Sequence, residues 1–80
     1  MKTDNAPWED LSVQDILERA IADEEGVRDY YRRAATKAGN AHVRQVLLRL
    51  SESEQGHADT LRKELDELHL QQDLEAGMAD

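Results

Sequence analysis

Three residues near the middle of the chain have the side chains and the spacing of a carboxylate–imidazole metal site. Glu24 lies in one long stretch without strong helix breakers, and Glu54 and His57 lie in a second such stretch. Because Glu54 and His57 are three positions apart, they project from the same face of a helix. Carboxylates combined with imidazole suit oxygen-preferring or borderline metals such as iron and manganese. The residue types alone therefore favour a site for such a metal.

Two predicted helices position these residues. A capping-box pattern begins at Ser12, and only Gly26 interrupts the helix-forming sequence before Gly39-Asn40, which is the strongest turn signal in the chain. We expect Gly39 to end the first helix in a left-handed conformation and Asn40 to cap the second. The prediction is an all-α antiparallel hairpin over residues 12–70, with a flexible lead at 1–11, helices at 12–38 and 41–70, a turn at 39–40, and an acidic tail at 71–80 that frays.

Each predicted helix carries an apolar stripe that is interrupted by the three residues. In the first helix, alternating steps of four and three residues select Val13, Leu17, Ala20, Glu24, Val27, Tyr31, Ala34 and Ala38. In the second helix, they select Val43, Leu47, Leu50, Glu54, His57, Leu61, Glu64 and Leu68. In a hairpin folded at residues 39–40, residues whose numbers sum to about 80 lie at one level, so Glu24 meets Glu54 and His57 within about one helical turn.

An isolated hairpin provides only half of a dinuclear metal site. An ionised carboxylate in an apolar stripe is costly unless it is paired or bound to a metal, and no Lys or Arg occupies either stripe. A two-fold homodimer would supply four Glu and two His around two divalent ions, which matches the ligand set of carboxylate di-metal bundles. Dimerisation would also compensate for a small core, since the chain has no Phe. We therefore predict a homodimer.

The composition excludes or disfavours several other classes of protein. The chain has 80 residues and a formal net charge of −8, which fits a single small domain and disfavours nucleic acid as a partner. It contains no cysteine, which excludes disulfides, thiolate zinc sites, iron–sulfur clusters and a rubredoxin-type iron site. No apolar run approaches the roughly 18 residues of a membrane span, and none follows the N-terminus as in a signal peptide. We expect a cytoplasmic protein with no membrane partner.

Two further residues have open interpretations. Asp23 is either a surface acid or an outer group that attracts cations toward Glu24. Tyr31 lies two turns after Glu24 on the same stripe, and is either a core aromatic or a hydroxyl close to the metals. Glu-x-x-His is also a common chance pattern in Glu-rich helices, so the alternative to the whole site is a solvated helical hairpin.

Two segments together resemble the ferritin-like superfamily. They are Asp23-Glu24-Glu25-Gly26-Val27-Arg28-Asp29-Tyr30-Tyr31 and Ser53-Glu54-Gln55-Gly56-His57. The first resembles a ligand Glu followed seven residues later by Tyr, and the second resembles Glu-x-x-His. The resemblance covers about residues 12–68, is to the rubrerythrin-related half-bundle members, and is closest to the encapsulated ferritins. It implies a two-helix protomer that dimerises into a ferritin-like four-helix bundle.

The resemblance further implies a di-iron ferroxidase centre at the dimer interface, which oxidises Fe(II) with O₂ for iron storage or detoxification. The implied metal ligands are Glu24, Glu54 and His57 of each chain, with Tyr31 near the chemistry and Asp23 as an outer metal-entry carboxylate. Iron is the implied metal, with Mn, Ca or Zn as substitutes in a crystal. It also implies a ring of dimers inside an encapsulin nanocompartment.

Two alternative functions remain open. One is a rubrerythrin-like di-iron peroxide reductase, which would need an external electron donor because the chain has no cysteine. The other is a non-catalytic helical hairpin that acts as an adaptor for a partner helix.

This sequence also departs from the encapsulated ferritins in two places. Gly26 stands where a second entry-site acid is often found, and the tail at 71–80 does not resemble a shell-targeting peptide.

Overall fold

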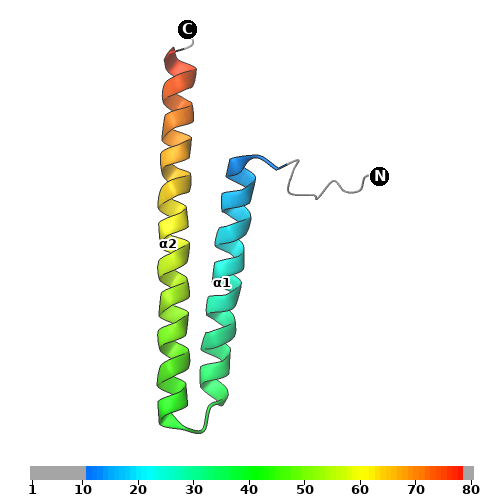
Figure 1. Cartoon of the computed structure of the whole chain (residues 1–80), viewed down its shortest axis with the longest axis vertical. Coiled ribbons are helices and arrows are strands. Elements are labelled where there is room, and N and C mark those ends of the chain that lie inside the picture. The colour runs from blue at the N-terminus through cyan, green and yellow to red at the C-terminus, as the bar shows by residue number, and fades with distance from the viewer. Residues whose placement is uncertain (1–10, 79–80) are drawn as a thin grey trace, which may run out of the picture.

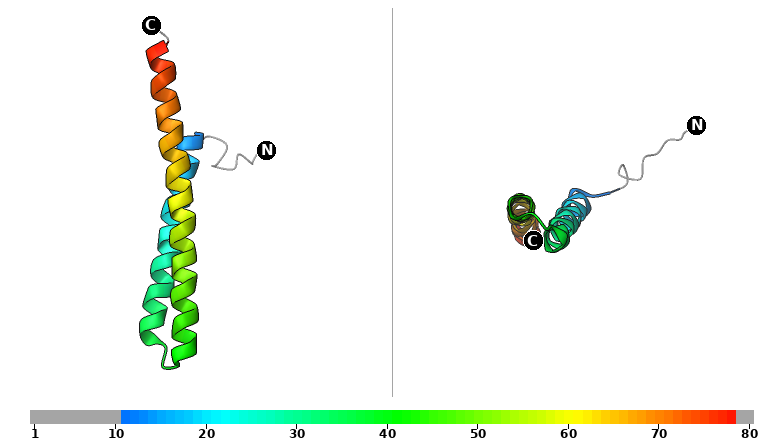
Figure 2. Two further views of the ribbon diagram at one scale, coloured as in Figure 1. Left: turned by 90° about the vertical axis from the view of Figure 1, so that its left-hand side faces the viewer. Right: turned by 90° about the horizontal axis from the view of Figure 1, so that it is seen from below.

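The computed structural model describes residues 11–78, which form two antiparallel helices joined by a short turn (Figure 1). Helix α1 comprises Val13–Lys37 and helix α2 comprises Ala41–Met78. The helices lie side by side over the length of α1, and α2 continues beyond the start of α1 (Figures 1 and 2). The predicted all-α hairpin is confirmed. Most of the predicted lead, residues 1–10, lies outside the described residues.

Helix α1 begins with the predicted capping box. The Ser12 hydroxyl accepts a hydrogen bond from the backbone N–H of Asp15 at 3.0 Å, and the Asp15 carboxylate accepts one from the backbone N–H of Ser12 at 3.3 Å. Two N–H groups that have no partner within the helix are thereby satisfied. The start of α1 at Val13 is therefore set by local sequence.

The turn between the helices differs from the prediction at Gly39. Ala38 leaves α1 in an extended conformation, with φ −76° and ψ 121°, and no glycine within residues 11–78 has a positive φ. The prediction of a left-handed Gly39 was wrong, because the extended Ala38 already redirects the chain. Asn40 caps α2 as predicted, since its Oδ1 accepts a hydrogen bond from the backbone N–H of Val43 at 3.0 Å.

Helix α2 is longer than the sequence pattern predicted. We expected it to end at residue 70 and the tail at 71–80 to fray, but the helix continues to Met78. Residues 71–76 are mostly good helix formers, and no Gly or Pro interrupts them before Gly77. The apolar stripe therefore ended before the helix did.

The contact between the helices is narrow and is made mainly by small side chains. Within the described residues the buried apolar side chains are Ile21, Ala35 and Ala58, and the buried polar side chain is Ser51, whose hydroxyl donates to the Leu48 carbonyl at 2.6 Å. None of these lies on the predicted stripes, whose members are half-buried or exposed. The stripes were thus placed about one helical row away from the true line of contact.

The two broad faces of the hairpin differ in chemistry. One face is closed by polar contacts, in which Arg62 pairs with Glu25 and Arg28 donates to Gln55. The other face, called the open apolar face, is formed by residues repeating at seven-residue steps, namely Val13, Ala20 and Val27 on α1 and Val43, Leu50 and His57 on α2. Most of these side chains are exposed. In residues 11–78 neither helix contains a stretch long and apolar enough to traverse a bilayer.

Candidate metal centre

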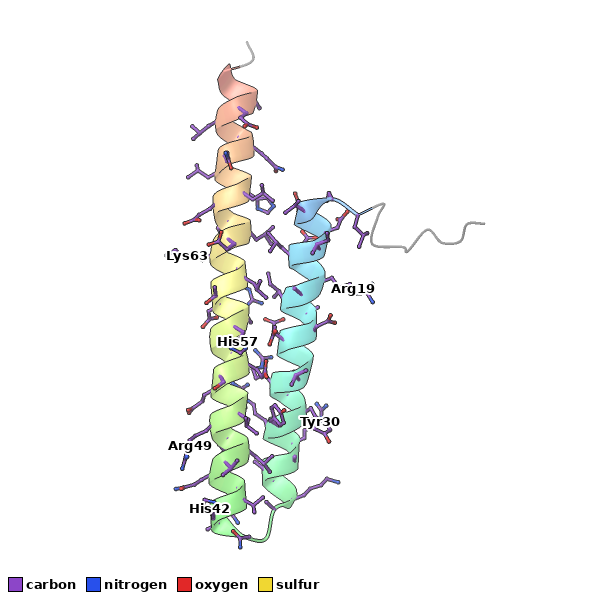
Figure 3. The ribbon with its side chains drawn as sticks, viewed as in Figure 1. Arg19, Tyr30, His42, Arg49, His57 and Lys63 are labelled. Carbon is purple, nitrogen blue, oxygen red and sulfur yellow. The ribbon has the colours of Figure 1, made fainter. Side chains whose placement is uncertain are left out.

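The structure brings Glu24, Glu54 and His57 together between the two helices. One ligand atom from each side chain can be chosen so that all three atoms lie within 4.8 Å of one another. The Nδ1 atom of His57 is 3.5 Å from Oε1 of Glu24 and 3.4 Å from Oε1 of Glu54. His57 lies midway along α2, on the side that faces α1 (Figure 3). The residue types and the geometry both suit a divalent cation.

Local structure explains why the three side chains meet. Glu54 and His57 are separated by three positions on α2, so they lie on adjacent turns of one face. The tight turn at Gly39-Asn40 fixes the register of the antiparallel helices and brings Glu24 to their height. No loop contributes to the group, so two regular helices fix its geometry.

The group opens onto the open apolar face. The side chains of Glu24 and Glu54 are 31% and 20% exposed, whereas that of His57 is 63% exposed. The carboxylates therefore sit partly within the helix contact, and the imidazole stands at its edge. An iron or manganese ion held by these three ligand atoms would keep some coordination positions free. Those free positions would lie on the open apolar face and point away from the hairpin.

The two carboxyl groups are electrostatically coupled. The pKa of Glu24 is raised mainly because its carboxyl group hydrogen-bonds to Glu54, with burial and the charge of Glu54 adding to the effect. The pKa of Glu54 is lowered mainly because it receives that hydrogen bond, and His57 lowers it further. Where these glutamates titrate, the proton is therefore held more strongly by Glu24 than by Glu54. No Lys or Arg forms an ion pair with either acid within residues 11–78.

Metal binding is expected to compete with the proton on Glu24 and therefore to weaken as the pH falls. The raised pKa of Glu24 means that its proton persists above the usual range for glutamate, so a cation must displace it at mildly acidic pH. Mn(II) affinity measured by calorimetry should therefore be lower at about pH 4.5, close to the ordinary pKa of glutamate, than at about pH 7, and the raised pKa of Glu24 means that the fall begins above the ordinary range for glutamate. Glu24→Gln should bind more weakly and show less of this dependence. Equal wild-type affinity at both pH values would contradict the prediction.

Arg28 is a structural neighbour of the site that the sequence analysis did not single out. Its side chain is largely buried, with its Nε donating to Asp29 at 2.9 Å and its Nη1 donating to Gln55 at 2.6 Å. Gln55 follows Glu54 directly, so this bond joins the two helices beside the ligands. The seven-residue step from Ile21 through Arg28 to Ala35 is the sequence signal that could have identified this position.

Asp23 and Tyr31 lie outside the group of ligand atoms. Asp23 is exposed on α1, and Tyr31 is half-buried with its ring 5.8 Å from that of Tyr30 in an edge-to-face arrangement. Neither supplies a ligand atom to the group in this structure. A role for Asp23 in cation entry, and for the Tyr31 hydroxyl near the metals, remains a prediction.

Comparison with protein families places the chain in a known family. A family model described as Rubrerythrin matches residues 15–78, which include nearly all of both helices and all three ligand-type residues. The chain belongs to the rubrerythrin family. Comparisons with curated proteins and with solved structures gave no match.

Membership of the rubrerythrin family gives the cluster a chemical context. A domain of this family indicates a di-iron protein of the ferritin-like superfamily, and the two carboxylates and imidazole of the cluster are ligands that iron accepts. The resemblance to this superfamily inferred from Glu24, Glu54 and His57 is thereby confirmed. The match does not bear on a ring of dimers or an encapsulin shell, which remain predictions from the resemblance.

Proposed function

We propose that this rubrerythrin-family chain is a ferroxidase that oxidises Fe(II) to Fe(III) with O₂ as a homodimer. The observation that carries the proposal is the cluster of Glu24, Glu54 and His57, which lie at one level and form no ion pair with a Lys or Arg within residues 11–78. Two neighbouring carboxylates at the edge of an apolar face have an unfavourable electrostatic free energy unless a cation is bound. Iron is the cation that the family match favours.

A second copy packed on the open apolar face would complete the centre. Each hairpin would contribute two carboxylates and one imidazole, so that four negative charges balance two Fe(II) ions while the imidazoles stay neutral. The same contact would cover exposed apolar side chains such as Val27, Val43 and Leu50. This arrangement supplies a core that an isolated hairpin lacks, since its buried apolar side chains within residues 11–78 are Ile21, Ala35 and Ala58.

In this reaction Fe(II) is the substrate, and the residues bind it and favour its oxidised form. When bound, the iron pair supplies electrons to O₂. The carboxylates of Glu24 and Glu54 interact more strongly with Fe(III) than with Fe(II), which favours loss of an electron. The imidazole of His57 presents Nδ1 toward both carboxylates and is itself the third ligand. The surrounding apolar side chains would exclude bulk water from the centre.

Fe(II) oxidation on mixing with air tests the proposal. Fe(II) is added anaerobically to wild type and to Glu54→Ala, and oxidation is followed by absorbance after air is admitted. We expect Glu54→Ala to oxidise iron only at the rate of free Fe(II) in the same buffer, because one ligand in three is lost. Glu52→Ala is the matched control, since Glu52 is an exposed acid two positions away. Equal rates for wild type and Glu54→Ala would overturn the proposal.

The family match also favours a second candidate, a di-iron peroxide reductase. Because this chain contains no cysteine, such an enzyme would depend on an external electron donor. Faster reoxidation of the Fe(II)-loaded protein by H₂O₂ than by O₂ would support this alternative.

Metal analysis separates both enzymes from a non-catalytic adaptor, because either di-iron enzyme should hold about one iron per chain after reconstitution.

A further inference from the structure

Arg28 is the one cationic residue that helix geometry places beside a ligand acid. Among the residues three or four positions from Glu24 or Glu54, Arg28 is the only Lys or Arg. Residues at this spacing are neighbours on a helix surface, and an acid followed four positions later by a cation is the favourable order for an ion pair. Local structure would therefore let Arg28 pair with Glu24 and neutralise it.

The structure shows Arg28 bound elsewhere. Its Nε donates to Oδ1 of Asp29 at 2.9 Å, and its Nη1 donates to Oε1 of Gln55 on α2 at 2.6 Å. Gln55 is held in turn, because its Nε2 donates to Oδ1 of Asp59 at 2.9 Å. The Arg28 side chain is only 18% exposed, so these bonds fix its position. Within residues 11–78 Arg28 forms no ion pair with Glu24.

The electrostatic surroundings of Arg28 agree with this placement. The pKa of Arg28 is raised mainly by its hydrogen bond to Asp29, and the charges of Asp29, Glu25 and Asp59 add to the effect, whereas burial opposes it. The charges that act on the pKa of Glu24 are instead those of Glu54 and His57. Arg28 therefore interacts with acids on the side of the hairpin away from the ligands.

This side of the hairpin also holds a second cation near the ligand level. We call it the closed face, meaning the side on which Arg28 meets Gln55 and Arg62 meets Glu25. Glu25 and Gln55 directly follow the ligand acids Glu24 and Glu54 in the sequence. The residue after each ligand acid is thus bound to an arginine of the opposite helix.

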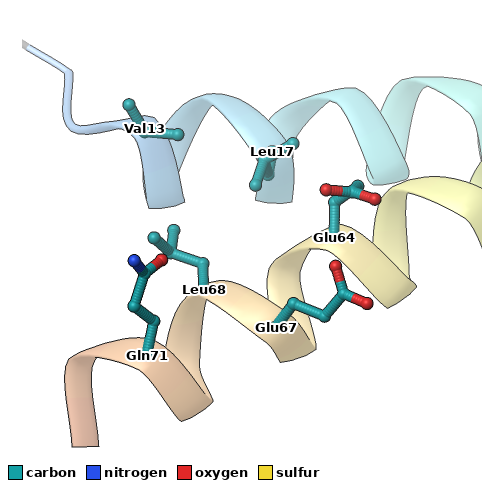
Figure 4. A pocket seen from close by; sticks show the side chains of 6 residues that line it. All are labelled: Val13, Leu17, Glu64, Glu67, Leu68 and Gln71. Carbon is teal, nitrogen blue, oxygen red and sulfur yellow. The ribbon is translucent and has the colours of Figure 1, made fainter. Parts of the chain in front are cut away.

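The open apolar face carries acids but no cation where it continues toward the free end of α2. A groove there is lined by apolar and acidic or amide side chains from both helices (Figure 4). They are Val13, Leu17, Glu64, Glu67, Leu68 and Gln71. Arg28 is therefore the cation whose position decides whether Glu24 is neutralised from within the chain.

We propose that Gln55 and Asp29 are positioning residues that hold Arg28 on the closed face and so keep Glu24 available to a divalent cation. The inference rests on the metal centre of the proposed function, but not on the oxidation of iron. If Arg28 paired with Glu24, an entering metal would have to displace the guanidinium from the carboxylate. It would then bind beside a positive charge that repels it. Both effects would weaken metal binding.

Releasing Arg28 should weaken metal binding, and removing it should then restore binding. In the double variant Asp29→Asn/Gln55→Met, called the release variant, both acceptors of Arg28 are changed. Its Mn(II) affinity, measured by calorimetry at pH 7, should be about tenfold lower than that of wild type. Adding Arg28→Met to the release variant should return the affinity to within about twofold of wild type. Adding Arg32→Met instead is the control, because it removes the same charge from an exposed position one turn further along α1 and should leave the affinity low.

The recovery separates positioning from a merely structural role. If the bonds of Arg28 acted only by holding the helices together, the variant that also lacks Arg28 would bind Mn(II) as weakly as the release variant or more weakly. That result would overturn the inference, as would wild-type affinity in the release variant or equal recovery with Arg32→Met. In each of these cases wild type still binds Mn(II), and the proposed function stands. A wild-type protein that binds no Mn(II) or Fe(II) would overturn both.

Discussion

Addition of Fe(II) or Mn(II) to the metal-free protein is expected to tighten the dimer by about a hundredfold for each of the two ions that only the dimer binds, at a free metal concentration about 100 times the dissociation constant. The proposed centre takes ligands from both copies, so a bound metal is held fully only in the dimer. Linkage then requires that the metal favour the dimer to the extent that it binds the dimer more tightly. Sedimentation equilibrium under anaerobic conditions, with and without metal, measures this effect.

Ligand variants provide the controls for metal-coupled assembly. His57→Ala removes the most exposed of the three ligands and should abolish the response to metal while leaving both helices intact. Glu52→Ala should respond like wild type, because Glu52 lies outside the ligand group. A dimer that is tight without metal, and no tighter with Fe(II) or Mn(II), would contradict the expectation.

The metal should matter for assembly because the open apolar face alone would drive dimerisation only weakly. Its side chains include small residues such as Ala20, and its middle is occupied by His57 beside two acids that repel each other. Apolar burial alone must overcome this repulsion and the entropy lost on association. A divalent cation removes the repulsion and adds bonds across the interface, so the unfavourable middle of the face becomes its strongest contact.

The ligand cluster was predictable from the sequence because each step depended on local structure. The spacing of Glu54 and His57 follows from the helical repeat, and the level of Glu24 follows from the turn at residues 39–40. The caps at Ser12 and Asn40 were equally local, since each is made by a side chain that reaches only three residues along the chain. None of these features needed knowledge of how the helices cross.

The line of contact between the helices was not predictable in the same way. Leu17 and Tyr31 are larger than Ala58 and Ser51. The two small residues are nevertheless the ones that are almost fully buried, because they let the helix backbones approach closely. Which of two adjacent rows is buried depends on the helix crossing angle, and on interhelical bonds such as that from Arg28 to Gln55. Neither the crossing angle nor these bonds can be predicted from the apolar periodicity of a single helix.

Ile21→Ala is expected to lower the free energy of unfolding of the metal-free protein by about 2–4 kcal/mol. Ile21 is 7% exposed and is the one large side chain among the buried apolar residues within positions 11–78. Its loss would remove buried apolar surface and leave a cavity in the contact between the helices. Because the contact between the helices is so small, this change removes a large share of what stabilises an isolated hairpin.

Ile16→Ala is the matched control, since it makes the same change on the same helix at a side chain that is 43% exposed. Urea unfolding followed by circular dichroism, at concentrations where the metal-free protein is monomeric, should show little effect of this variant. In the metal-loaded dimer Ile16→Ala should become more costly. Ile16 is three positions from Val13 and four from Ala20, so it borders the open apolar face that is then covered. Equal destabilisation by the two variants in the monomer would mean that the helices pack along a different line. The side-by-side comparison thus separates the contact that forms each hairpin from the contact that joins two hairpins around the metal.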